Sequence, residues 1–130
     1  MRTVRVSNRE RAAVVGDQVR VADRWWARLR GLIGRPPPEE GEGLLIPSSQ
    51  GVHMWWMRYS LDVALLDAEG QVVALYPRLR PGGRTRLHWK ARYALELPIG
   101  TLSRTGTEIG DRLEWAASAP EGGRAGAPAR

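Results

Sequence analysis

The sequence predicts a mainly β domain, either a compact β-sandwich or a small barrel, with one short amphipathic helix near residues 23–34. Short apolar runs separated by Gly- and Pro-rich turns recur along most of the chain. Only one segment has its apolar residues at steps of three and four. Helices therefore do not alternate with strands, and we do not expect a doubly wound parallel sheet.

Length and composition set the expected domain organisation. A chain of 130 residues suits one domain with one core, which we place at residues 1–116. Residues 117–130 are mainly Ala, Pro, Gly, Ser and Arg without an apolar period, so we expect a disordered tail. The sequence shows no signal-peptide core and no apolar stretch long enough to span a membrane. We therefore expect a cytoplasmic protein without a membrane partner.

The first strands are expected within residues 2–21. Apolar and polar residues alternate there, and the alternation is divided at Ser7-Asn8 and at Gly16-Asp17. Such residue pairs are typical of tight turns, so this region predicts two or three strands.

The single helix is expected to begin at Asp23, a suitable N-cap, and to end at Gly34. Three prolines at residues 36–38 prevent its continuation. Arginines, including Arg28, occupy the side opposite the apolar residues. That apolar side consists of Trp25, Trp26, Leu29, Leu32 and Ile33.

The remaining strands are expected as short apolar runs. Residues 52–59 are bulky throughout, which is typical of a strand packed on both faces. Residues 101–103 are expected to form a short helical turn. The other expected strands are residues 44–46, 61–66, 71–76, 93–97 and 112–115, with a hairpin turn at residues 67–70.

Several motifs together resemble domain-of-unknown-function family 192. Residues 52–63 are similar to its I-H-T-F-F-M-R-F-P-I-D-V block. The other matches are residues 23–35 to R-x-x-GLM-x-R, 43–46 to G-M-L-F, 66–73 to L-D-x-x-G-x-V-V, 94–101 to V-L-E-L-P-A-G-T and 110–113 to G-D-R-L.

The resemblance covers roughly residues 20–115 in order and implies a β-sandwich of jelly-roll type. It implies no reaction, because the family has no established activity. Ser60 stands where the family has proline, and Trp55-Trp56 stand where it has two phenylalanines. The larger Trp pair is expected to make a neighbouring pocket smaller or flatter.

Residues 53–62 form the strongest candidate site, because Trp, His, Arg and Asp crowd together there. In an extended strand, His53 and Trp55 point to one face, and Trp56 and Arg58 to the other. His53 is a candidate ligand contact or proton shuttle. A histidine bonded to a backbone group is the simpler interpretation.

Two carboxylates interrupt apolar runs. Asp62 is expected to pair with Arg58 or to bind turn amides, while an anion site built on Arg58 is the functional alternative. Glu96 alternates out of phase with its neighbours, so a solvated face is the simplest account. The alternative is a pocket carboxylate facing Arg28 or Arg58. The complete candidate ligand-binding set is His53, Trp55, Trp56, Arg58, Asp62, Glu96 and Arg28.

Other chemistry has little support in the sequence. Without cysteine there is no thiol nucleophile, cysteine–zinc site or disulfide. The sequence has no G-x-S-x-G elbow, P-loop or G-x-G-x-x-G motif. Its two histidines, His53 and His88, have no metal-ligand spacing, and we expect neither a metal nor a cofactor.

The segment at residues 78–92 is expected to be an exposed basic loop. It carries six positive charges and no negative one, within a chain of net charge +6. Trp89, His88 and Tyr93 accompany these charges. Basic residues interleaved with aromatics are typical of surfaces that bind single-stranded nucleic acid, although a solvated loop explains the same pattern.

Three functional hypotheses follow. The first is a non-catalytic binding module for a small polar or anionic ligand, such as a sugar or a carboxylate. The second is a hydrolase or lyase that uses His53 with Asp62 or Glu96 as acid and base. The third is nucleic-acid binding through residues 78–92.

Overall fold

The regular secondary structure of the described residues consists of one seven-stranded sheet and a short helix. The computed structural model describes residues 2–22, 35–54 and 57–118. The strand order is β5-β4-β6-β3-β2-β1-β7. Only the β2–β3 pair is parallel among these strands. The elements are β1 (Thr3–Asn8), β2 (Ala13–Val21), β3 (Glu42–Pro47), β4 (Leu61–Leu66), β5 (Val72–Leu79), β6 (Tyr93–Leu97), α2 (Thr101–Thr105) and β7 (Leu113–Ala117).

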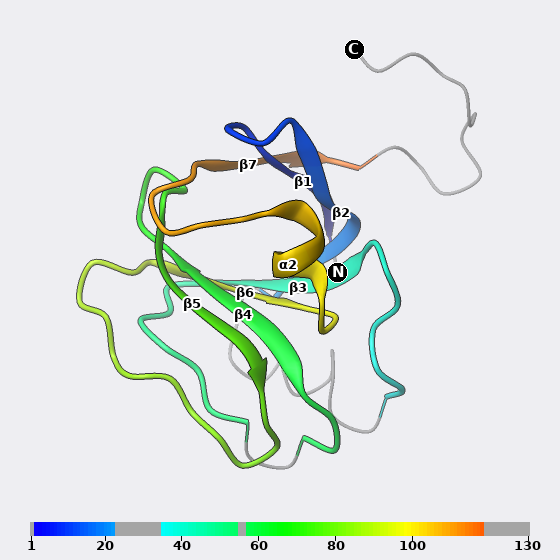
Figure 1. Ribbon diagram of the computed structural model, residues 1–130, viewed down its shortest axis with the longest axis vertical. Helices are drawn as coiled ribbons and strands as arrows, with labels where there is room; N and C mark the ends of the chain where they lie inside the picture. Colours follow the sequence, from blue (N-terminus) through cyan, green and yellow to red (C-terminus); the bar gives the residue numbers. More distant parts are fainter. Residues whose placement is uncertain (1, 23–34, 55–56, 119–130) are drawn as a thin grey trace.

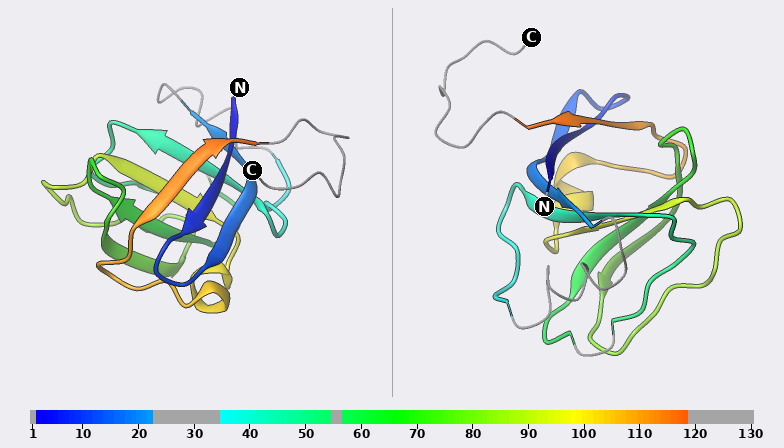
Figure 2. Two further views of the ribbon diagram at one scale, coloured as in Figure 1. Left: turned by 90° about the horizontal axis from the view of Figure 1, so that it is seen from above. Right: turned by 180° about the vertical axis from the view of Figure 1, so that it is seen from behind.

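The sheet curls into a half-barrel, with α2 at one end (Figures 1 and 2). Its outermost strands, β5 and β7, approach each other where they begin. Gln71 forms a β-bridge with Arg112, and the Val72 N–H donates to the Asp111 carbonyl at 2.8 Å. The predicted mainly β architecture is confirmed. Because all the described strands belong to one sheet, the small-barrel alternative describes it better than the two facing sheets of a jelly roll.

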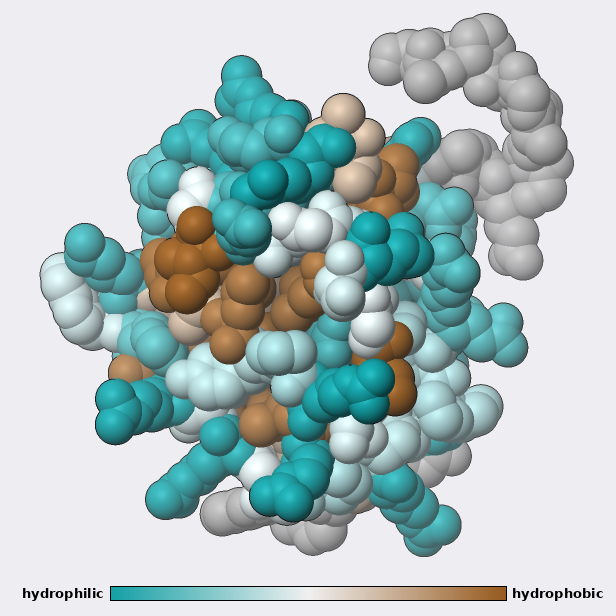
Figure 3. All heavy atoms as spheres, in the orientation of Figure 1, coloured by the Kyte–Doolittle hydropathy of each residue, from teal (hydrophilic) through white to brown (hydrophobic). Residues whose placement is uncertain are grey.

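Apolar side chains cover both faces of this sheet. The inner face of the half-barrel carries one buried cluster, which includes Leu45, Leu95 and Leu102 of α2. The outer face carries a second, which includes Leu44, Val63 and two residues of the covering loop. Those two loop residues are Met54 and Met57. Hydrophobic atoms visible in Figure 3 gather between β5 and α2, at the open side of the half-barrel.

The cross-strand register assigns residues to these faces, since directly paired residues share a face. One row runs through Arg20, Leu44, Glu96 and Val63. Leu44 and Val63 belong to the outer cluster, so Glu96 and Arg20 also face outward. Asp62 is the neighbour of Val63 along β4 and therefore faces inward.

The hairpin between β4 and β5 follows the predicted turn chemistry. Asp67 Oδ1 accepts the N–H groups of Glu69 and Gln71 at 3.0 and 2.9 Å. Gly70 has a φ of 85°, which a residue with a side chain rarely adopts. Near its far end, β5 contains Pro77 and then Arg78 at a φ of 55°. The pairing with β4 shifts register at this point, which marks a bulge.

Two details of the expected strands are wrong. Gly16-Asp17 is not a turn, because β2 runs through it and the irregularity is absorbed by a register shift in the β1–β2 pairing. The described part of residues 52–59 is not a strand and has only a bridge at His53. Its apolar character arises because Met54 and Met57 cover the outer face as a loop.

The remaining expectations have mixed outcomes. The helical turn after residue 100 is confirmed as α2, and the other expected strands are present within a few residues. The helix expected at residues 23–34 and the tail from residue 119 lie outside the described residues. No helix in the described part of the chain has the length and apolarity needed to cross a membrane.

Candidate ligand-binding groove

Two loop segments, residues 50–54 and 82–88, run antiparallel to each other beside β5. Backbone hydrogen bonds of 2.7 to 2.9 Å hold them together, and His53 forms a β-bridge with Arg84. The two loops therefore form a ribbon with a fixed register. The bonds join Met54 to Gly83, Val52 to Thr85 and Gln50 to His88.

Close approach of the two loops depends on Gly51. A Cβ atom there would lie 2.7 Å from Thr85 Oγ1 and 2.9 Å from the Arg86 carbonyl oxygen, closer than real side chains come. The buried Thr85 hydroxyl accepts the Val52 N–H at 3.1 Å and donates to the Arg86 carbonyl at 2.8 Å. Gly51 and Thr85 together therefore fix the spacing of the ribbon.

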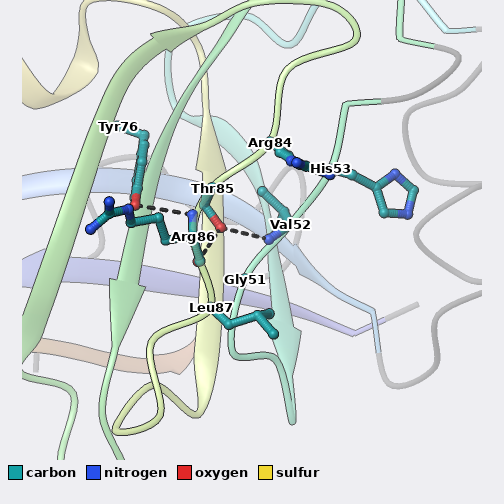
Figure 4. Close-up of a pocket in the computed structure, with 8 residues that line it drawn as sticks. All are labelled: Gly51, Val52, His53, Tyr76, Arg84, Thr85, Arg86 and Leu87. Atoms are coloured by element: carbon teal, nitrogen blue, oxygen red, sulfur yellow. Dashed lines mark hydrogen bonds between the residues drawn. The ribbon is translucent and has the colours of Figure 1, made fainter.

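A groove of about 840 Å³ lies along this ribbon (Figure 4). Its volume falls in the range typical of small-molecule sites. Val52, Leu87 and the ring of Tyr76 supply apolar surface, while Arg84, Arg86 and Thr85 supply polar groups. The lining residues are Gly51, Val52, His53, Tyr76, Arg84, Thr85, Arg86 and Leu87.

Tyr76 connects β5 to the loop at residues 84–88. Its hydroxyl accepts the Arg86 N–H at 3.2 Å and lies 2.8 Å from His88 Nε2. A hydroxyl has one proton to donate. The tautomer of His88 decides whether the hydroxyl donates this proton to Nε2 or accepts a hydrogen bond from it. The rings of Tyr76 and His88 also meet edge to face at a centroid distance of 5.9 Å.

The charged groups of the groove are all positive. Arg84 and Arg86 are exposed, and neither forms an ion pair with a residue in the described ranges. Among the residues that the structure describes, no Asp or Glu lines the groove. A guanidinium presents several N–H donors in a planar fork that matches a carboxylate or phosphate. The groove therefore has the electrostatic character of an anion-binding surface.

His53 lines the groove, but its ring is turned away. In Figure 4 the imidazole points away from Tyr76 and Arg86, on the opposite side of the ribbon. Its Nδ1 atom is buried. The structure therefore does not bring the His53 ring together with Tyr76 and Arg86.

Asp62 is a structural carboxylate. It is 1% exposed, and its two oxygens accept backbone N–H groups, Oδ1 from Arg78 at 3.0 Å and Oδ2 from Leu102 at 2.9 Å. It thereby holds the bulge of β5 and the first turn of α2. This matches the interpretation in which Asp62 binds turn amides. Because Asp62 faces inward, it lies on the opposite side of the sheet from His53 and the groove.

Glu96 is not on a solvated face, contrary to the simplest expectation, since it is only 1% exposed. Its strand is covered on the outer side by the loop that carries Met54 and Tyr59, so alternation did not lead to solvent. Burial and the negative charge of Glu96 raise the pKa of Tyr59. Burial and the positive charge of Arg35 lower the pKa of Arg20. These residues form a crowded polar cluster on the outer face.

The other predicted site residues are dispersed or lie elsewhere. Arg58 is exposed, so it does not pair with the buried Asp62. Trp55, Trp56 and Arg28 lie outside the described residues.

Sequence reasoning missed two groove residues, Tyr76 and Thr85, and it also missed His88, which does not line the groove but bonds to Tyr76. His88 was expected to be exposed, but it is half-buried and bonded to Tyr76. The chain carries Tyr76 within an ordinary apolar strand pattern, which gave no signal. The available clue was the basic run next to it, which contains Arg84 and Arg86.

The fold and sequence have clear relatives. A UPF0127 protein of the archaeon Thermococcus sibiricus is 32% identical over 112 residues, covering 83% of this chain and 72% of that protein. A UPF0127 protein of Pyrococcus furiosus is 34% identical over 101 residues, covering 75% of this chain and 86% of the relative.

Two crystal structures are similar in fold. One, from Sinorhizobium meliloti 1021 and described as a candidate transcription regulator, has a TM-score of 0.70 at 25% identity and covers 88% of this chain and 92% of that one. Another, a Novosphingobium aromaticivorans protein of unknown function, has a TM-score of 0.71 at 21% identity, with coverages of 87% and 84%. The model of domain-of-unknown-function family 192, described as "Uncharacterized ACR", matches residues 4–115. The chain belongs to this family, as its motifs between residues 23 and 113 predicted.

Proposed function

We propose that the protein is a non-catalytic binding module for a small anionic ligand with an apolar body, and that the groove beside Tyr76 is its site. The observation that carries this proposal is the make-up of the groove wall. Two exposed guanidinium groups, Arg84 and Arg86, flank an apolar hollow of about 840 Å³ that no carboxylate of the described ranges lines. Ligands with a carboxylate or phosphate group and an aliphatic or aromatic body suit such a wall.

The hydrogen bonds around the groove favour binding over catalysis. The Tyr76 hydroxyl is engaged by His88 and by the Arg86 N–H, and the Thr85 hydroxyl by two backbone groups. These groups fix the shape of the wall. A general base would have to face the ligand within hydrogen-bond reach, and the His53 ring is directed elsewhere.

Calorimetric titration with a panel of carboxylates and phosphates tests the proposal. The double variant Arg84→Gln with Arg86→Gln should weaken the best ligand at least tenfold, because a hydrogen bond to a charged group contributes roughly 1.5–3 kcal/mol. Tyr76→Phe should also weaken it, by loosening the loop that presents Arg86.

The matched control is Arg5→Gln, an exposed arginine on β1. It changes the net charge without touching the groove and should leave affinity within twofold. Equal losses of ligand affinity in Arg5→Gln and in the groove variants would mean that the overall positive charge of the protein, and not the groove, attracts the anion. Absence of any ligand across the panel would also refute the proposal.

A further inference from the structure

Residues 84–92, of which 84–87 also line the groove, form a loop in which cations surround exposed apolar side chains. Leu87 is 81% exposed and Trp89 is 75% exposed, although both are large and apolar. Lys90 and Arg92 are exposed as well, and neither forms an ion pair with a residue in the described part of the chain. Together with Arg84 and Arg86, they make a surface without neutralising partners.

The main chain at Trp89 is held in place from two sides. Its carbonyl oxygen accepts hydrogen bonds from Gln50 Nε2 at 3.0 Å and from Arg92 Nη1 at 2.8 Å. The turn beneath it is closed by the Ala91 N–H, which donates to the His88 carbonyl at 2.8 Å. An exposed indole on a fixed backbone loses little conformational freedom when a planar group stacks on it.

A positive charge lies over the Trp89 ring, and a hollow lies on the same loop. Lys90 Nζ lies over one face of the Trp89 ring, 5.4 Å from its centroid, so a stacking base would use the opposite face. A second hollow of about 500 Å³ adjoins the groove at Gly51 and Leu87, and its described lining offers hydroxyl, amide and guanidinium groups without a carboxylate. Its lining residues are Ser48, Ser49, Gln50, Gly51, Leu87, Ala91 and Arg92.

We infer that this loop binds single-stranded nucleic acid, with a base stacked on Trp89 and phosphates contacting Lys90, Arg92 and Arg86. Proteins that bind single strands without sequence preference combine a positive backbone track with aromatic stacking platforms. Charge alone would equally suit an acidic peptide. The fixed and exposed indole favours nucleic acid, because every nucleobase offers a flat face and acidic side chains do not.

Fluorescence anisotropy with a labelled single-stranded oligothymidylate, measured between 50 and 200 mM salt, tests the inference. Trp89→Ala should weaken binding about tenfold or more, whereas Trp89→Phe should retain most of the affinity. Lys90→Gln should reduce the slope of log affinity against log salt by about 0.7, the value for one phosphate contact on a single strand.

Two controls separate stacking from general effects. Ile109→Ala removes another exposed apolar side chain, and Arg5→Gln removes a cation on β1. Both should bind the oligonucleotide within twofold of the parent. Because Trp89, Ile109 and Arg5 are all exposed, circular dichroism should show unchanged folding in each variant.

Three results would overturn the inference: no binding at 50 mM salt, equal losses in Trp89→Ala and Ile109→Ala, or equally effective competition by a polyglutamate peptide. The last would identify the loop as a surface for acidic proteins. This test is independent of the proposed ligand groove, since Trp89 and Lys90 do not line it. Trp89→Ala should leave small-anion binding unchanged.

Discussion

The guanidinium group of Arg11 holds the carboxylate of Asp111 from a distance of 100 residues along the chain. Arg11 Nε donates to Oδ2 at 2.9 Å and Nη2 to Oδ1 at 3.1 Å. The same carboxylate accepts Asn8 Nδ2 at 3.0 Å and the Glu108 N–H at 2.9 Å. This cluster fastens the turn after β1 to the loop before β7, next to the place where β5 and β7 approach each other.

The Arg11–Asp111 pair predicts a loss of stability in acid. Hydrogen bonding to Arg11 first, and then to Asn8 and Glu108, lowers the pKa of Asp111 from 3.8 to about 2 against the opposing effect of burial. The folded protein therefore binds this proton less readily than the unfolded chain. Its stabilising contribution, on the order of 1–2 kcal/mol, should be complete above about pH 5 and disappear as pH falls towards 2.

Urea unfolding between pH 2 and pH 6 measures this effect. Asp111→Asn should lower stability at pH 6 and flatten the acid limb of the profile. Glu114→Gln, on the exposed side of β7, is the control and should keep the parent's acid limb. An unchanged limb in Asp111→Asn would show that other carboxylates cause the acid sensitivity.

Asp62→Asn should destabilise the fold without affecting the groove. The substitution places an NH2 group against the Arg78 or the Leu102 N–H, which leaves a buried donor without an acceptor at a cost of about 1–3 kcal/mol. Thermal unfolding measures the loss, and hydrogen exchange should show faster opening of α2. Asp17→Asn, at an exposed position of β2, should change stability little. A selective loss of ligand affinity in a stable Asp62→Asn variant would contradict this assignment.

Gly51→Ala should open the ribbon formed by residues 50–54 and 82–88. The added methyl group would meet Thr85 Oγ1 and the Arg86 carbonyl, so one loop has to move. We expect about 1–3 kcal/mol of destabilisation and faster exchange of the Val52 and Thr85 amides. Gly82→Ala is the comparison, because nothing lies within 4 Å of its Cβ and only its φ of 80° is strained. Unchanged exchange in Gly51→Ala would mean that the loops tolerate the crowding.

Glu96→Gln should make Tyr59 easier to ionise. Burial, followed by the charge of Glu96, raises the pKa of Tyr59 above its usual 10.0, so removal of the charge leaves burial as the remaining cause. Ultraviolet difference titration should show the Tyr59 transition at lower pH in Glu96→Gln than in the parent, with Tyr59→Phe identifying the signal. In the parent, the raised pKa means that the folded state favours the protonated Tyr59 hydroxyl more than the unfolded chain does. This contribution to stability is lost as pH rises above about 10. An identical Tyr59 transition in both proteins would place the two side chains too far apart to interact.

The strands were predictable wherever apolar alternation and turn residues agreed. Asp67 and Gly70 marked the β4–β5 hairpin because their chemistry acts locally. The two-sided burial of β4, β6 and β3 was less apparent. In these strands even the residue opposite Val63, Glu96, is buried, because a loop distant in sequence covers it.

The candidate site was predictable only in its charge. Arg84 and Arg86 stood out as part of a basic run, whereas Tyr76 and Thr85 became important only through the tertiary contacts of the loops. Asp62 was correctly suspected of binding turn amides, but its partners in β5 and α2 depend on the curl of the sheet. His53 was chosen because it lies in the stretch at residues 53–62 where Trp, His, Arg and Asp crowd together, and that pattern does not give the direction of its ring.

The bulge at Pro77 and Arg78, near the end of β5, bears on how the molecule behaves at high concentration. β5 is the outermost strand on its side, and an outermost strand presents backbone groups that another chain can pair with. Pro77 has no N–H to offer, and the left-handed backbone of Arg78 bends the ladder away from a straight course. Edge-to-edge stacking of molecules into fibrils is thereby disfavoured along this strand.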